Sequence, residues 1–100
     1  MSRLGPVFQR LRDEGRRAVI PYLVAGDPNE GLTVPLMHSL VEAGADVIEV
    51  GVPFSDPMSE GPTIQKGHER ALAGGTSLNS TLALIAEFRQ TDLETPLILM

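Results

Sequence analysis

The stretch Val47-Ile-Glu-Val-Gly-Val-Pro-Phe-Ser-Asp-Pro-Met-Ser-Glu60 places a carboxylate in an apolar run and follows it with a loop rich in glycine and proline. Glu49 lies inside the apolar run, before Val50, and the loop carries two further acids, Asp56 and Glu60. A helix start follows at Gly61-Pro-Thr63. An acid at the C-terminal end of a strand, with a loop that folds another acid back over it, is typical of active sites in (β/α) barrels. The stretch therefore predicts acid–base chemistry on a small molecule.

Apolar runs alternate with helical patterns on both sides of this stretch. The strands are expected at residues 18–24, 46–50 and 97–100. One helix is expected near the N-terminus, with an apolar face of Leu4, Phe8 and Leu11, and three others have predicted inner faces at Leu36-Met37-Leu40-Val41, Ile64-Ala71-Leu72 and Leu78-Leu82-Ile85. Pro35 is expected in the first turn of its helix, and Pro21 is expected to interrupt the first strand. This order predicts parallel strands with right-handed crossovers.

The fold class that follows is α/β, with about three parallel strands, intervening helices and an extra helix at the N-terminus. Three parallel strands leave open edges, whereas a closed barrel needs eight strands and about 250 residues. We therefore expect residues 1–100 to be the N-terminal segment of a single (β/α)₈ TIM-barrel domain that continues beyond residue 100. Such a piece is expected to unfold weakly and without cooperativity.

The composition excludes several classes of function. The net charge of −5 argues against a nucleic-acid partner, and the arginines near the N-terminus are not interleaved with aromatic residues. The chain has no cysteine, which excludes disulfides and thiolate metal sites. No apolar run is long enough to span a bilayer, and the first residues do not resemble a signal peptide. We expect a cytoplasmic protein without a membrane partner.

Glu49 is the strongest candidate for a catalytic residue. Strand alternation places it on the same side as Val47 and opposite Ile48 and Val50. A carboxylate in such a run is paired, protonated or functional, unless it simply reaches solvent at the strand end. For Glu60 a purely structural role is a stronger alternative, because a negative charge just before a helix-opening proline interacts favourably with the helix dipole.

Other polar residues carry weaker signals. Asp56 can hydrogen-bond within its own turn, so a structural or partner-contact role is expected for it. His38 and His68 lie on predicted helices without a second ligand at metal spacing, and they are interpreted as surface residues. No phosphate-binding glycine loop or zinc signature is present.

The loop Pro53-Phe-Ser-Asp-Pro57 followed by Gly61-Pro-Thr-Ile-Gln65 resembles the signature of the tryptophan synthase α-chain family. The flanking segments Ala43-Gly-Ala-Asp46 and Ile48-Glu-Val-Gly51 are similar to it as well, and so are Tyr22 and Gly26-Asp-Pro28. The resemblance covers essentially the whole chain, which corresponds to the first third to two-fifths of a family member.

The resemblance implies a carbon–carbon lyase of tryptophan biosynthesis. Its members cleave indole-3-glycerol phosphate to indole and glyceraldehyde 3-phosphate by a retro-aldol reaction that needs no metal or organic cofactor, and they pass indole to the β chain of an α2β2 heterotetramer. By resemblance, Glu49 moves protons at the ring carbon and the hydroxyl, and Glu60 faces the ring nitrogen. Tyr22, Ile64 and Met100 match positions that line the indole pocket, and Pro53 and Asp56 match positions that contact the β chain.

One departure from the family pattern falls at Glu60, where the family usually has aspartate. The extra methylene moves the carboxylate by about 1 Å unless the loop adjusts. This departure motivates one alternative, a barrel without catalysis that docks on and regulates the β chain. A second alternative is another phosphosugar barrel enzyme, because strand–Glu–Gly patterns occur in several such barrels. The phosphate-binding loops of the family lie beyond Met100, so residues 1–100 alone are expected to be inactive.

Overall fold

The computed structural model describes residues 2–54 and 61–100. The elements in chain order are α1 (Leu4–Glu14), β1 (Tyr22–Val24), α2 (Glu30–Glu42), β2 (Ile48–Gly51), α3 (Pro62–Ala73), α4 (Leu78–Arg89) and β3 (Leu97–Leu99). The strands form one parallel sheet in the order β1-β2-β3. The predicted α/β fold with parallel strands and an N-terminal helix is confirmed.

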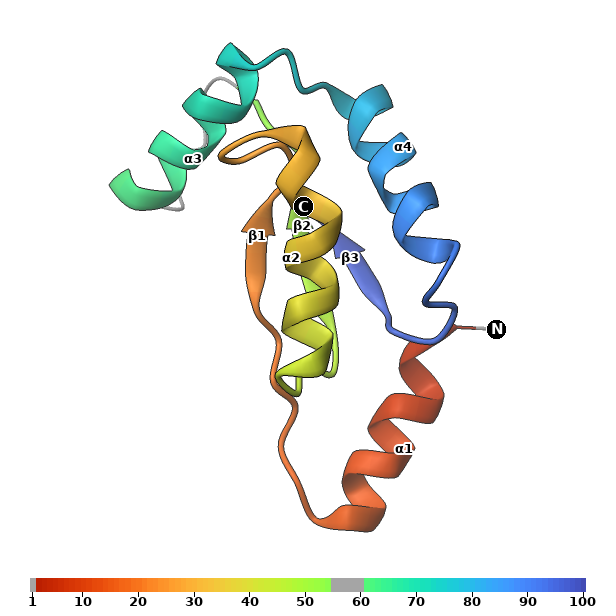
Figure 1. The fold of residues 1–100 in the computed structure, drawn as a ribbon. Helices are drawn as coiled ribbons and strands as arrows, with labels where there is room; N and C mark the ends of the chain where they lie inside the picture. Colours follow the sequence, from red (N-terminus) through yellow and green to blue (C-terminus); the bar gives the residue numbers. More distant parts are fainter. Residues whose placement is uncertain (1, 55–60) are drawn as a thin grey trace.

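Different helices lie at the two ends of the sheet. Figure 1 shows α1 near the ends where the strands begin and α3 near the ends where the strand arrows point. α2 and α4 pack against each other. A buried core joins these two helices to the sheet, and its members are Ala25, Val34, Met37, Ile48, Val50 and Phe88. A smaller cluster joins Val7 and Leu11 of α1 to Val47.

The first strand is shorter than predicted. Residues 18–21 precede β1 without strand geometry, although their carbonyls still accept hydrogen bonds from the neighbouring segment. The Asp46 amide donates to Val19 O at 2.9 Å, and the Glu49 amide donates to Pro21 O at 2.9 Å. Pro21 has no amide hydrogen to return, so the ladder is one-sided there and the regular strand begins at Tyr22.

Helix α2 begins earlier than predicted. Asn29 caps it, because its side-chain oxygen accepts a hydrogen bond from the Leu32 amide at 3.1 Å. Pro35 therefore lies inside the helix and not in its first turn. Met37 is buried as predicted, whereas Leu36 is exposed on the outer face.

The inner faces of α3 and α4 were predicted correctly only in part: Ala71 is buried, and Ile64 and Ile85 are half-buried. Pro62 opens α3 and Ser77 caps α4, as expected. However, Leu72, Leu78 and Leu82 are exposed. Thr81 is buried in α4 instead, and its hydroxyl is satisfied because it donates to Ser77 O at 2.7 Å. A threonine whose hydroxyl is hydrogen-bonded to the preceding turn can occupy a core position. A prediction based on the spacing of leucines misses such a residue.

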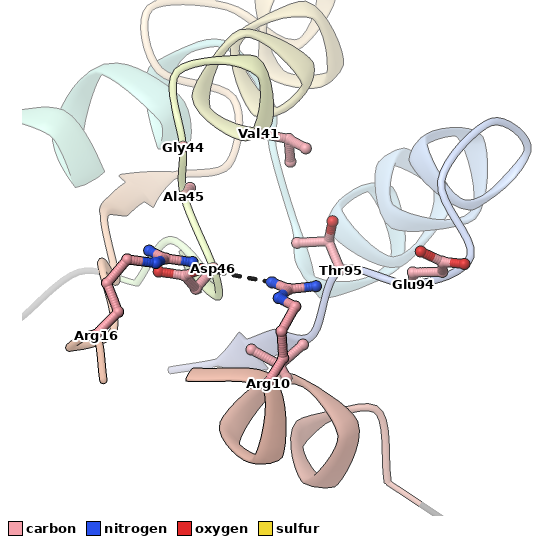
Figure 2. A pocket seen from close by; sticks show the side chains of 9 residues that line it. Arg10, Arg16, Val41, Gly44, Ala45, Asp46, Glu94 and Thr95 are labelled. Carbon is pink, nitrogen blue, oxygen red and sulfur yellow. Dashed lines mark hydrogen bonds and ion pairs between the residues drawn. The ribbon is translucent and has the colours of Figure 1, made fainter. Parts of the chain in front are cut away.

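A buried carboxylate fixes the end of the sheet where the strands begin. Asp46 has a side chain only 3% exposed, and it accepts a hydrogen bond from the Val19 amide at 2.8 Å. Figure 2 shows Arg10 and Arg16 approaching it from two sides, with ion-pair distances of 3.6 and 3.3 Å. Hydrogen bonds to Glu14 and then to Asp46 raise the pKa of Arg16. Asp46 thus links the start of β2 to the segment before β1, where Pro21 weakens the ladder.

Replacing Asp46 with alanine is expected to lower the free energy of unfolding by about 1–3 kcal/mol, because the Val19 amide loses its charged acceptor in a nearly buried setting. Urea unfolding of the full-length protein, monitored by circular dichroism, measures the change. Asp13→Ala is the matched control, since Asp13 is exposed and accepts a hydrogen bond from Gln9 on the same helix. Equal unfolding midpoints for the two variants would contradict the role given to Asp46.

Candidate active site at the C-terminal ends of the strands

Glu49 lies in the middle strand and faces away from the α2–α4 core. Its backbone partners are Tyr22 in β1 and Ile98 in β3. Ile48 and Val50, its neighbours along the strand, are buried against the helices. Glu49 itself is half-buried on the other face. The predicted orientation of Glu49 is confirmed, and Tyr22 and Ile98 share its face of the sheet.

Gly51 and Met100 continue this face one layer further toward the strand ends. The Met100 amide donates to Val50 O at 3.0 Å, and the Val52 amide donates to Met100 O at 3.1 Å. These bonds extend the β2–β3 ladder past Leu99 and set Met100 beside Gly51. Met100 is 57% exposed. Of the predicted site residues, Glu49, Tyr22 and Met100 therefore share one face of the sheet.

The phenol of Tyr22 extends along this face toward the strand ends. A Cβ atom at Gly51 would overlap the Tyr22 hydroxyl and lie 2.7 Å from Cζ of its ring. Only a residue without a side chain leaves room for the ring in this position. The Tyr22 hydroxyl also lies 3.1 Å from Nε2 of His68 on α3.

His68 was predicted to be a surface residue, and the structure shows that this prediction is wrong. The residue is 1% exposed, and its Nδ1 accepts a hydrogen bond from the Phe54 amide at 3.2 Å. The helical spacing carried a signal for this position, because His68 follows Ile64 by four residues and precedes Ala71 by three. Sequence reasoning treated the imidazole as polar and missed that both ring nitrogens could find partners inside.

His38 differs from His68 in burial and surroundings. It is half-buried, its Nε2 lies 3.0 Å from the Thr91 hydroxyl, and its ring centroid lies 4.7 Å from that of Phe88. These contacts place it between α2 and the end of α4, remote in the fold from the strand ends where Tyr22 and Glu49 meet. It is a packing residue.

Ile64 joins Tyr22 at a cavity of about 240 Å³ between β1 and α3. The other residues that line the cavity are Leu23, Val24, Asp27, Thr63, Gly67 and Arg70. Asp27 and Arg70 form a two-point ion pair, with Nε–Oδ1 at 2.7 Å and Nη2–Oδ2 at 3.1 Å. The hydrogen bond to Asp27, followed by its negative charge, raises the pKa of Arg70.

Two predicted residues, Asp56 and Glu60, lie outside the described residues. Pro53, the other predicted partner contact, is buried, whereas its neighbour Phe54 is 51% exposed. Phe54 also stacks edge-on to His68, with ring centroids 5.5 Å apart. The assignments of Glu60 as a base and of Pro53 and Asp56 as partner contacts stay predictions.

The cavity around Asp46 (Figure 2) is larger, at about 540 Å³. It lies at the opposite end of the sheet, because Asp46 comes just before the start of β2. Three of the charged residues that line it pair with one another, because Arg10 and Arg16 both form ion pairs with Asp46. In parallel α/β folds the chemistry lies at the C-terminal ends of the strands, and the opposite end serves stability. We therefore place the candidate site at Glu49. Within residues 2–54 and 61–100, no group of three or more acidic or histidine side chains could hold a metal ion.

The tryptophan synthase alpha chain family model matches residues 8–100. The chain belongs to this family. It is 63% identical to the tryptophan synthase alpha chain of Dechloromonas aromatica and 62% identical to that of Nitrosococcus oceani, over all 100 residues. The crystal structure of tryptophan synthase subunit alpha from Legionella pneumophila str. Paris matches with a TM-score of 0.97 and 50% identity, covering 100% of this chain.

The chain spans about 37% of the length of these alpha-chain relatives and 38% of the Legionella chain. It corresponds to the N-terminal part of the family's (β/α)₈ barrel, which agrees with the three parallel strands described above. None of the helices in the described part of the chain has the length and apolar character that a membrane crossing requires.

Alanine at position 51 is expected to displace the Tyr22 ring and to lower the free energy of unfolding by about 1–3 kcal/mol, because the new methyl overlaps the phenol in a buried setting. Urea unfolding of the full-length protein measures the loss. Gly5→Ala is the matched control, since a Cβ at Gly5 meets nothing within 4 Å. Equal stability of the Gly51→Ala and Gly5→Ala variants would contradict the close approach of Tyr22 to Gly51.

Proposed function

We propose that the protein carrying these residues is the α subunit of tryptophan synthase and cleaves indole-3-glycerol phosphate to indole and glyceraldehyde 3-phosphate. Residues 1–100 would supply the first strands of a single (β/α)₈ barrel domain and would be inactive alone. The position of Glu49 carries this proposal. It is a half-buried carboxylate on the middle strand, directly beside Tyr22 and near the strand ends, in a chain that belongs to the alpha-chain family.

The reaction requires proton transfers at two places on the substrate. The bond between the indole ring and the glycerol side chain breaks only after the ring carbon gains a proton, which makes indole a leaving group. The hydroxyl next to the breaking bond must lose a proton to become the aldehyde. A single carboxyl group that gives up one proton and takes another can serve both steps, and we assign this role to Glu49.

The residues around Glu49 suit a flat aromatic ring. Tyr22 and Met100 lie on the same face of the sheet, on the two strands that flank it. Ile64 meets Tyr22 at the cavity between β1 and α3. We propose that Tyr22, Ile64 and Met100 form walls of the indole pocket, because apolar and aromatic side chains with few convergent polar groups are what such a ligand requires.

The second carboxylate and the partner are further parts of the proposal. Glu60 would face the ring nitrogen and stabilise the positive charge that develops on the protonated ring. Pro53 and Asp56 would contact the tryptophan synthase β chain in an α2β2 complex that receives the indole, and the complex would work in the cytoplasm. Support for the partner comes from solved M. tuberculosis tryptophan synthase, to which the chain is 45% identical with a TM-score of 0.88. No finding favours a purely regulatory barrel or a different phosphosugar enzyme.

The test is indole release from indole-3-glycerol phosphate by the full-length protein, with and without the β chain. Glu49→Gln is expected to lower kcat by about 100-fold or more, because the amide keeps the shape of the side chain but cannot transfer a proton. Glu42→Gln is the control, since Glu42 is an exposed residue at the end of α2.

Two results would count against the proposal. Cleavage that survives in Glu49→Gln would remove Glu49 from the proton transfers while leaving the lyase activity in place. A full-length protein that fails to release indole even with the β chain present would refute the lyase function itself, and turnover of a different phosphosugar would then replace it.

A further inference from the structure

His68 connects three segments that are far apart in the sequence. Its Nε2 meets the Tyr22 hydroxyl of β1 at 3.1 Å, and its Nδ1 meets the Phe54 amide, three residues past β2, at 3.2 Å. The imidazole itself is carried by α3 and is 1% exposed. A buried histidine with both nitrogens engaged restricts the movement of its neighbours, because breaking either hydrogen bond inside the protein costs free energy.

The direction of each hydrogen bond follows from the main chain. The Phe54 amide can only donate, so Nδ1 of His68 must be the acceptor and carries no hydrogen. The neutral ring then carries its hydrogen on Nε2, which donates to the oxygen of Tyr22. The Phe54 amide thereby favours the Nε2–H tautomer, which can donate a hydrogen bond to the Tyr22 hydroxyl.

We propose that His68 is a positioning residue for the aromatic side of the substrate site. It holds the Tyr22 ring over Gly51 and ties it to the main chain at Phe54, so that this wall of the site is in place before the substrate binds. The proposal rests on the proposed function, because the ligand that would contact the Tyr22 ring is the indole ring of the substrate. His68 acts through Tyr22 and not on the substrate.

The packing around His68 supports a positioning role. Tyr22 is the cross-strand neighbour of Glu49, so a rotation of its ring would change the shape of the site directly beside the proposed proton-transfer group. Gly51 provides the space that the phenol occupies. The hydrogen bond from His68 also fixes where the Tyr22 hydroxyl lies, which packing against a glycine alone does not do.

Two substitutions separate the two bonds of His68. His68→Asn keeps an acceptor near the place of Nδ1 for the Phe54 amide but does not reach Tyr22. His68→Gln is long enough to place an amide donor near Nε2 and so to keep the bond to the phenol. In the full-length protein with the β chain, His68→Asn is expected to raise KM for indole-3-glycerol phosphate by about tenfold with kcat changed by less than about threefold, because Glu49 is untouched.

His68→Gln is expected to restore KM to within about threefold of the wild type. In a Tyr22→Phe background, which lacks the hydroxyl, His68→Asn is expected to raise KM no further, because the two changes remove the same bond. His38→Asn is the matched control: this histidine also meets a hydroxyl, that of Thr91, but lies away from the strand ends, and its KM should equal that of the wild type.

The proposal would be overturned by an unchanged KM in His68→Asn, by equal damage in His68→Gln and His68→Asn, or by effects of Tyr22→Phe and His68→Asn that multiply. A second measurement does not depend on activity. The nitrogen-15 NMR shifts of the His68 ring should report hydrogen on Nε2 alone at neutral pH, and a ring with hydrogen on Nδ1 would overturn the proposal even if the protein releases no indole. Absence of indole release by the wild type would refute the proposed function separately.

Discussion

The two parallel ladders on β2 fix the direction of every side chain in that strand. β1 and β3 bond to opposite edges of β2, so its register is held from both sides. Shifting β2 by one residue would turn Ile48 and Val50 out of the helix-covered core, and burying each of these side chains is worth about 1.5–3 kcal/mol. The same shift would press Glu49 among apolar residues, where a carboxylate without partners is costly. Burial on one face therefore enforces the position of the acid on the other.

The two ends of the sheet are held by different kinds of contact. At the end where the strands begin, Asp46 replaces ladder bonds that Pro21 cannot make, and side-chain charge does the joining. At the opposite end the Tyr22 ring is held by its close fit against Gly51 and its hydrogen bond to His68, and the Asp27–Arg70 ion pair joins α3 to the segment after β1. The ion pairs of the buried Asp46 thus stabilise the end where the strands begin, and the Tyr22 ring shapes the end where the candidate site lies. This agrees with barrel folds, in which one end of the strands serves stability and the other carries the chemistry.

The sequence predicted those features that depend on strong local rules. Alternation gave the parallel order and the orientation of Glu49, and proline and serine chemistry gave the starts of α3 and α4. The inner face of α4 was missed because Thr81 satisfies its hydroxyl within its own helix and can then be buried. The role of His68 was missed for a related reason. Its partners, Tyr22 and the Phe54 amide, are brought to it only by the tertiary fold, and no local pattern encodes them.

The position of His68 depends in turn on the glycine that precedes it. Gly67 weakens α3 by about 1 kcal/mol relative to alanine. A Cβ at this position would lie 2.9 Å from the Asp27 carboxylate, so the glycine lets α3 approach the segment after β1 closely. Arg70, one turn further along α3, donates two hydrogen bonds to the same carboxylate. Because α3 is held this close to β1, the residue after Gly67 can reach Tyr22. A local loss of helix stability is thus the condition for a hydrogen bond beside the proposed active site.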